Sequence, residues 1–338
     1  MYFSNKLKIK MIKNIAVIGA GLAGITIASK MNEKFDVKVF EKSRGVGGRM
    51  STRQETPFFF DHGAQFFKIK TSDFKIFLSE LFSQQIIQPW SFRLAYFDRQ
   101  NLSKIKLIKH EDKFYVGVPN MNSIVKHLSK KCNVILNTKI ERIINENDKW
   151  NLYDQNKKSY GSYDLVVLSL PAQQSLKLIT KKVSFYPLIE KIKMKGCFSL
   201  MVGMSEPLNL DYDAALIENE DIAWFAVNNS KPFRMNNYCL LINSSYEYAS
   251  KNINTSKDKV LKHLLNISSE FINYDLSKSN MIKIHKWRYV EAKCSPKENY
   301  FIDHKEKVAA CGDWFINSRV EGAFLSANEL AKKINCPE

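Results

Sequence analysis

The chain has 338 residues, of which 45% are hydrophobic and 25% are charged. These values are typical of globular proteins and exclude collagen-like, coiled-coil and wholly disordered classes, and the length is sufficient for about two domains. The net charge of +17 comes from 51 basic residues spread along the whole chain, 42 of them lysines. We interpret this charge as a solvated surface that attracts small anions, not as a nucleic-acid-binding stripe.

Hydrophobic periodicity predicts strands and helices along most of the chain. Residues 1–10 have no such pattern, and we expect them to be a disordered lead ahead of Met11. The predicted strands are residues 14–18, 37–41, 90–94, 104–108, 134–144, 150–153, 165–170, 198–204, 222–227, 238–243, 282–287 and 308–311. The predicted helices are residues 22–31, 72–83, 121–130, 258–271 and 321–334.

A glycine-rich turn joins the first predicted strand to the first predicted helix. It reads Gly19-Ala20-Gly21-Leu22-Ala23-Gly24, and Glu41 follows 20 residues after Gly21. Such glycines let the backbone approach a pyrophosphate at a helix start, and an acid at this spacing can accept hydrogen bonds from the hydroxyls of an adenosine ribose. The strand before the turn, the helix after it and the acid together predict a dinucleotide site.

Two further segments indicate which dinucleotide binds. Residues 44–49, Arg-Gly-Val-Gly-Gly-Arg, directly follow the second strand and offer a second backbone cradle for anions between two guanidinium groups. Near the other end, Asp313 follows Cys311-Gly312 ahead of the last helix. An acid at a strand end can bind a ribityl chain, and the helix start can stabilise negative charge on a flavin. The three segments together predict FAD, and we expect it to be bound without a covalent link to Cys311.

Nucleotide-binding features stand at both ends of the chain, so we expect both ends to fold together. The predicted architecture is α/β, with a discontinuous Rossmann-like FAD-binding domain from residues 11–75, 119–175 and 289–338. An inserted α+β substrate domain, with a mainly antiparallel sheet, is predicted from residues 76–118 and 176–288.

These segments resemble the amine-oxidase-like FAD flavoproteins, and within that group they are most similar to the bacterial branch of the renalase family. The similarity rests on residues 42–53, 60–67, 229–234, 285–289 and 311–323. It implies an oxidase that transfers a hydride from 2- or 6-dihydroNAD(P) to flavin N5, releases NAD(P)+ and reduces O2 to H2O2. The chain departs from the family at Phe66, where tyrosine is usual, and at Lys68, where a small hydroxyl residue is usual. We expect loss of the phenol at Phe66 to alter the substrate contact and to leave the fold unchanged.

The motif and the resemblance together give a set of predicted FAD-binding residues. They are Gly19, Gly21, Leu22, Ala23, Gly24, Glu41, Lys42, Arg44, Gly47, Gly48, Arg49, Met50, His62, Gly63, Ala64, Gln65, Ile140, Gly312, Asp313, Glu321, Gly322 and Ala323. We interpret His62 as structural or adjacent to the cofactor, because neighbouring residues of an extended segment point to opposite faces and Asp61 therefore cannot orient its ring.

A hydride donor that becomes aromatic needs a stacked and oriented position, but no acid or base. We therefore predict substrate-stacking walls from Phe66, Trp224, Trp287 and Tyr289. Gln65 and Arg288, together with Arg319, are predicted to orient the amide or the phosphates of the substrate. Ordinary core packing is the alternative for each aromatic residue.

Two other functions stay open from the sequence. One is an FAD-dependent amine oxidase or a desaturase of an apolar substrate, and the other is a flavin-bound redox sensor or interaction protein. Because the chain has a single glycine-rich fingerprint, a nicotinamide dinucleotide is expected to visit as a substrate. The six cysteines lack CxxC or zinc-ligand spacing, so we expect a reduced, cytoplasmic protein without a metal. Neither a membrane-spanning segment nor a nucleic-acid partner is expected.

Overall fold

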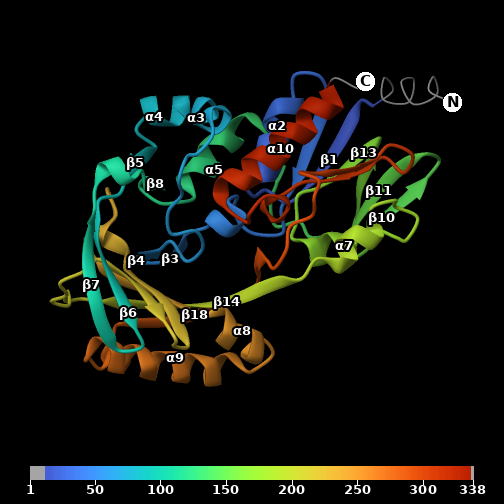
Figure 1. Cartoon of the computed structure of the whole chain (residues 1–338). Helices are drawn as coiled ribbons and strands as arrows, with labels where there is room; N and C mark the ends of the chain where they lie inside the picture. Colours follow the sequence, from blue (N-terminus) through green and yellow to red (C-terminus); the bar gives the residue numbers. More distant parts are fainter. Residues whose placement is uncertain (1–11, 336–338) are drawn as a thin grey trace.

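The structure is a computed structural model that describes residues 12–335 (Figure 1). The expectation for residues 1–10 lies outside the described residues. Strands from three separate parts of the chain form one six-stranded sheet in the order β19-β20-β13-β1-β2-β9, parallel except for the β19–β20 pair. Its strands are β1 (Asn14–Ile18), β2 (Asp36–Phe40), β9 (Asn133–Ile135), β13 (Leu165–Leu168), β19 (Phe301–Asp303) and β20 (Val308–Ala310). Both ends of the chain therefore build this Rossmann-like sheet, as the sequence predicts.

Both faces of the six-stranded sheet are covered, which explains why β13 is apolar throughout and fully buried. On one face, α2 (Leu22–Met31) and α10 (Val320–Asn335) pack against each other (Figure 1). The opposite face packs in a second apolar cluster, which includes residues of a small antiparallel sheet and of two short helices. These elements are β10 (Ile140–Glu146), β11 (Lys149–Asp154), β12 (Ser159–Tyr163), α6 (Ala172–Leu176) and α7 (Tyr186–Lys191).

A seven-stranded sheet has the order β18-β14-β17-β16-β15-β6-β7. All of its pairs are antiparallel except β15–β6, which confirms the predicted, mainly antiparallel sheet. Its strands are β6 (Phe92–Asp98), β7 (Asn101–Ile108), β14 (Met194–Met204), β15 (Ala214–Glu218), β16 (Ile222–Val227), β17 (Tyr238–Ser244) and β18 (Met281–Ala292). Helices α8 (Tyr246–Asn252) and α9 (Lys257–Ile272) cover the face that points away from α2 and α10 (Figure 1).

The remaining elements are short and connect the two sheets. They are β3 (Arg53–Glu55), β4 (Phe58–Phe60), α3 (Ser72–Phe77), α4 (Ser79–Ser83), β5 (Ile87–Pro89), β8 (Tyr115–Gly117) and α5 (Ser123–Leu128). Strand β3 pairs with β4, and β5 pairs with β8. Within residues 12–335, none of the helices is both long enough and apolar enough to cross a bilayer.

Two predictions of a single continuous element are wrong. The single helix predicted over residues 72–83 is two helices, α3 and α4, which meet at Leu78. The single strand predicted over residues 134–144 is two strands, β9 and β10, in different sheets. The break lies at Asn137, whose φ of 53° is left-handed and whose N–H donates to Ser43 O. The chain turns there because this segment bonds to the loop after β2.

Candidate functional site

The glycine-rich turn lies at the carboxyl end of β1. A Cβ atom on Gly24 would lie 1.9 Å from Gly19 O, so this glycine is required for close packing of helix and strand. Gly21 is different, because its φ of −75° suits any residue and the nearest atom to a Cβ there would be 4.0 Å away. The turn therefore leaves open space in front of α2, whose first N–H groups have no side-chain cap. The next two helical residues, Leu22 and Ala23, are buried.

The second glycine loop touches the first. Gly47 N donates to Ala20 O at 2.9 Å, and Gly21 and Gly47 form an isolated bridge. Gly47 has a φ of 128°, which only glycine adopts readily, and Gly48 has a left-handed φ of 54°, which favours glycine. Among their neighbours, Met50 is buried, whereas Lys42 and Arg44 are exposed. The two loops therefore form one continuous cradle.

Glu41 joins this cradle to the end of β2. Its carboxylate is 6% exposed and accepts hydrogen bonds from Ala20 N at 2.9 Å and Ser43 N at 2.8 Å. Its backbone oxygen accepts from Thr138 N, two residues before Ile140, the buried first residue of β10. The segment with Ile140 is thereby held against the carboxyl end of β2, where the sequence predicts that the adenosine ribose binds.

The carboxy-terminal part of the chain reaches the cradle through an ion pair. Arg49 binds the carboxylate of Asp313 with both terminal nitrogens, one of them at 2.7 Å, and donates to Val290 O at 2.9 Å. Arg49 O accepts from Ala64 N, and a Cβ on Gly63 would lie 2.0 Å from that oxygen. Predicted cofactor residues from residues 41–65 and from residues 312–313 are therefore brought together.

Glu321 has a different set of partners. Its buried carboxylate accepts from Lys70 N, Thr71 N and Thr71 Oγ1, so it holds the start of α3. A Cβ on Gly322 would lie 2.0 Å from Ile316 O, and Ala323 N donates to Arg319 O within the first turn of α10. These contacts within the protein explain why Glu321, Gly322 and Ala323 occupy their positions. Cofactor binding by these three residues stays a prediction.

The arrangement fits FAD. Open space lies beside Gly21 at a helix start, two glycine loops meet there, and Glu41 and Asp313 are at strand ends on the same edge of the sheet, where such sheets bind nucleotides. Next to Asp313, Gly312 N donates to Ser326 Oγ at 3.0 Å. Cys311 is buried, and burial raises the pKa of its thiol to about 12. A thiol in that state is a poor nucleophile, which agrees with a non-covalent cofactor.

His62 is the centre of an aromatic cluster beside this cradle. Its backbone oxygen accepts from Trp287 Nε1 at 2.8 Å, and its ring lies 5.1 Å from Trp287 and 4.9 Å from His285. Burial, followed by His285 and Arg53, lowers the pKa of His62 to about 3. Burial and the nearby cations Arg53 and Lys257 lower the pKa of His285 to about 4. Both imidazoles are therefore neutral at neutral pH.

The neutral state of His62 predicts a pH-dependent stability. The unfolded chain binds a proton near pH 6.5 but the folded one does not until about pH 3, so stability is complete above pH 6.5 and is lost as the pH falls. We expect His62 to contribute a slope of up to about 1.4 kcal/mol per pH unit in this window. Urea unfolding of the wild type and of His62→Phe at several pH values measures it. An equal slope in both proteins would contradict the prediction.

Phe66 lies in a second aromatic group. Its ring centroid is 4.6 Å from Phe114, 5.9 Å from Trp224 and 6.5 Å from Trp90. The indole N–H groups of Trp90 and Trp224 are buried and have no hydrogen-bond partner among residues 12–335. The structure therefore brings the predicted Phe66 and Trp224 together. Trp90 and Phe114 belong to the same group. The sequence analysis did not predict them as substrate-stacking residues, because only their aromatic character marks them in the sequence.

The other predicted substrate residues are dispersed. Gln65 Nε2 donates to Asp61 O and Gly63 O, while its Oε1 accepts from Lys231, so its polar atoms bind the protein itself. Arg288 is exposed and donates to Asn254 in the loop between α8 and α9. Tyr289 is half-buried on β18, and Arg319 is exposed near Glu291. Substrate contact by these four residues stays a prediction.

A buried ionic cluster lies next to Gln65, and the sequence did not predict it. Asp61 Oδ2 accepts from Arg234 Nη2 at 2.6 Å and from Lys231 Nζ at 3.3 Å, and these side chains are at most 1% exposed. Asp61 Oδ1 accepts from Thr52 Oγ1 and Met121 N. One carboxylate thus joins the segment after β4, the segment before α5 and the segment after β16.

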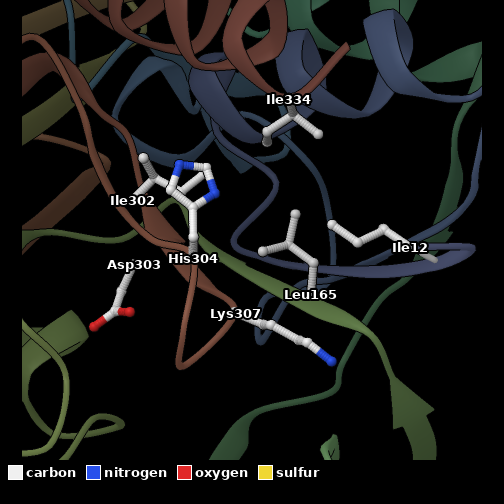
Figure 2. Close-up of a pocket in the computed structure, with 7 residues that line it drawn as sticks. All are labelled: Ile12, Leu165, Ile302, Asp303, His304, Lys307 and Ile334. Carbon is white, nitrogen blue, oxygen red and sulfur yellow. The ribbon is translucent and has the colours of Figure 1, made fainter. Parts of the chain in front are cut away.

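A surface hollow of about 360 Å³, partly open to solvent, lies elsewhere (Figure 2). Ile12 and Leu165 place it at the amino ends of β1 and β13, opposite to the glycine loops. Two of its polar groups already have partners, since Lys307 binds Asp148 and Asp303 accepts from Ser184 N at 2.7 Å. Nucleotides bind at the carboxyl ends of such strands, so this hollow is not a candidate nucleotide-binding site.

Two protein-family profiles match the chain. The NAD(P)-binding Rossmann-like domain matches residues 17–81, and the flavin containing amine oxidoreductase family matches residues 93–335. A zeta-carotene-forming phytoene desaturase from Myxococcus xanthus is 42% identical over 52 residues, which are 15% of this chain and 10% of the desaturase.

Solved structures extend the similarity to the whole fold. A protein assigned as a protoporphyrinogen oxidase from Exiguobacterium sp. 255-15 aligns with a TM-score of 0.77 and 10% identity, over 95% of this chain and 98% of the other. Cyclohexylamine oxidase from Brevibacterium oxydans IH-35A aligns with a TM-score of 0.74 and 11% identity, over 96% and 98%. At such low identity, these likenesses establish the fold alone.

Proposed function

Because this chain belongs to the flavin containing amine oxidoreductase family, we propose that it is a renalase-like oxidase of isomeric dihydronicotinamide dinucleotides. FAD is the expected non-covalent cofactor of the family. In the proposed reaction, 2- or 6-dihydroNAD(P) loses a hydride and becomes NAD(P)+. O2 takes up the two electrons and the proton of that hydride, together with one solvent proton, to give H2O2. Bound FAD supplies the acceptor that passes these electrons from the donor to O2.

The observation that carries this proposal is the weak basicity of the two imidazoles beside the aromatic walls. His62 and His285 have pKa values lowered to about 3 and 4, and Asp61 is paired with two buried cations. An amine must lose a proton from its ammonium form, whose pKa is about 10, before oxidation. A dihydropyridine needs no base, because loss of the hydride makes its ring aromatic. These residues therefore support the dihydropyridine as donor.

The chain also offers binding groups suited to such a donor. Phe66 and Trp224 provide flat apolar surface for a pyridine ring. Arg53 and Lys257 lie close enough to His285 to lower its pKa, and their charges favour an anionic diphosphate. The roles of these side chains in the proposal are to stack, to orient and to attract the substrate.

The proposal predicts the outcome of a donor test. Purified FAD-loaded protein is mixed anaerobically with 2- or 6-dihydroNAD and, separately, with a panel of primary and secondary amines. We expect the flavin absorption band to bleach with the dihydroNAD isomers, and O2 to restore it with formation of H2O2. Ordinary NADH, with its hydride at ring position 4, is the matched control and is expected to react at least 10-fold more slowly. Bleaching by amines alone would rule out the dihydronicotinamide proposal.

A second candidate is oxidation of an apolar amine or desaturation of an apolar substrate. The family match and the likeness in fold to a cyclohexylamine oxidase favour it. Phe66, Phe114 and the 40%-exposed Leu216 provide apolar surface that would accommodate such a substrate. The amine arm of the donor test distinguishes this candidate from the first.

A further inference from the structure

A row of side chains crosses one face of the seven-stranded sheet. The strand register pairs each member with the next, from β18 to β6, in the order His285, Ser199, Asn243, Trp224, Leu216 and Tyr96. Residues paired in this way share a face of the sheet, and in the antiparallel pairs their Cβ atoms lie about 4.5–5.5 Å apart. Asn243 and Trp224 are therefore direct neighbours.

This row faces the loop of residues 62–66. Ser199 Oγ lies 3.0 Å from His62 O, and the Trp224 ring lies 5.9 Å from Phe66. Asn243 is half-buried and Leu216 is 40% exposed, although their strands are otherwise largely buried. Asn243 and Leu216 are therefore accessible on either side of the buried Trp224, next to the predicted substrate-stacking walls.

One polar atom of the Asn243 amide has no hydrogen-bond partner among residues 12–335. Ser199 has one hydroxyl proton but lies within 3.0 Å of His62 O and 2.8 Å of Asn243 Oδ1. Turning the amide over resolves this, because Asn243 Nδ2 then donates to Ser199 Oγ and Ser199 donates to His62 O. In that orientation Oδ1 is a free acceptor, and no other residue among 12–335 binds the amide.

Trp224, on the strand paired with that of Asn243, supplies an unused donor among residues 12–335. Its side chain is 9% exposed, and its Nε1 is buried without a hydrogen-bond partner among the described residues. A buried donor without a partner destabilises the fold unless a ligand or water satisfies it. One donor and one acceptor on neighbouring strands match the two polar atoms of a primary carboxamide.

We propose that Asn243 and Trp224 form a subsite for a primary carboxamide. Trp224 Nε1 donates to the carbonyl oxygen, and Asn243 Oδ1 accepts from the NH2 group. The inference rests on the proposed function, since the ring carboxamide of a dihydronicotinamide is the group that would bind. A carboxylate in its place offers no donor to Asn243 Oδ1, so the subsite selects amide over acid.

The test uses unreactive probes and the FAD-loaded protein. Two amide and acid pairs, NAD+ with nicotinic acid adenine dinucleotide and benzamide with benzoate, are titrated while the flavin absorption spectrum is followed. We expect the wild type to bind each amide at least 10-fold more tightly than its acid. Asn243→Leu and Trp224→Phe are expected to reduce this ratio to near one, and Asn243→Asp, which keeps an acceptor, to retain it.

The test includes a matched control variant, and three outcomes would overturn the subsite. Asn145→Leu makes the same change at an exposed strand position of β10 and is expected to leave the ratio unchanged. The subsite is overturned if the wild type does not distinguish amide from acid, if no probe perturbs the spectrum, or if folded, FAD-loaded Asn243→Leu and Trp224→Phe retain the preference. If benzamide shows the preference but NAD+ does not bind, the subsite stands and the dinucleotide proposal fails.

Discussion

Replacing Asp61 by asparagine is expected to lower the free energy of unfolding by about 3–5 kcal/mol, because breaking a buried ion pair leaves uncompensated charge. Lys231 and Arg234 share this carboxylate, and their side chains are 0% and 1% exposed. Burial alone would raise the pKa of Asp61, but Lys231 and Arg234 outweigh it and hold the pKa well below its usual range. The ion pairs therefore contribute their full stability above about pH 4 and lose it as the pH falls further.

Urea unfolding near neutral pH, followed by tryptophan fluorescence, measures this loss. The control is Asp73→Asn, whose ion pair with Lys332 is exposed at both side chains and is expected to contribute about 0–1 kcal/mol. In a double variant, Lys231→Met removes one of the two unpaired cations and is expected to recover part of the stability. A loss below 1 kcal/mol in Asp61→Asn would contradict the role of this cluster.

The Asp61 cluster also shows what sequence patterns leave unseen. Asp61 and its two cationic partners are 170 and 173 residues apart, and no local periodicity records that separation. By contrast, β1, the glycine turn and α2 are set by neighbouring residues, and their predicted bounds agree with the structure. The glycine turn and its flanking elements could therefore be predicted, because the residues that form them are neighbours in the sequence.

The substrate side depends on strand register, which the sequence does not specify. Ser199 and Asn243 are polar residues within apolar strands, a signal that marks each as unusual without joining them. They become neighbours because β14 and β17 pair in one register. A slip of one residue would turn Asn243 to the face that packs on α8 and α9. Arg288, which the sequence predicts to orient the substrate, instead contacts Asn254 in the structure.

Gly21→Ala is expected to weaken FAD binding at least 100-fold while leaving the fold intact. The backbone at Gly21 suits alanine, and the added Cβ would meet no protein atom closer than 4.0 Å. The methyl group would instead occupy the space in front of α2 where a pyrophosphate must approach the helix N–H groups. The variant thus separates the need for glycine in folding from the need for glycine in binding.

Titration of the apoprotein with FAD, followed by quenching of flavin fluorescence, gives the affinity, and thermal unfolding of the apoprotein reports the fold. Ser29→Ala, further along the same helix, is expected to change neither. Gly24→Ala is expected to destabilise the apoprotein itself, because its Cβ would lie 1.9 Å from Gly19 O. If Gly21→Ala binds FAD as the wild type does, the pyrophosphate does not lie at this turn. The Arg49–Asp313 pair, which joins the two chain ends, would then have to be explained by folding alone.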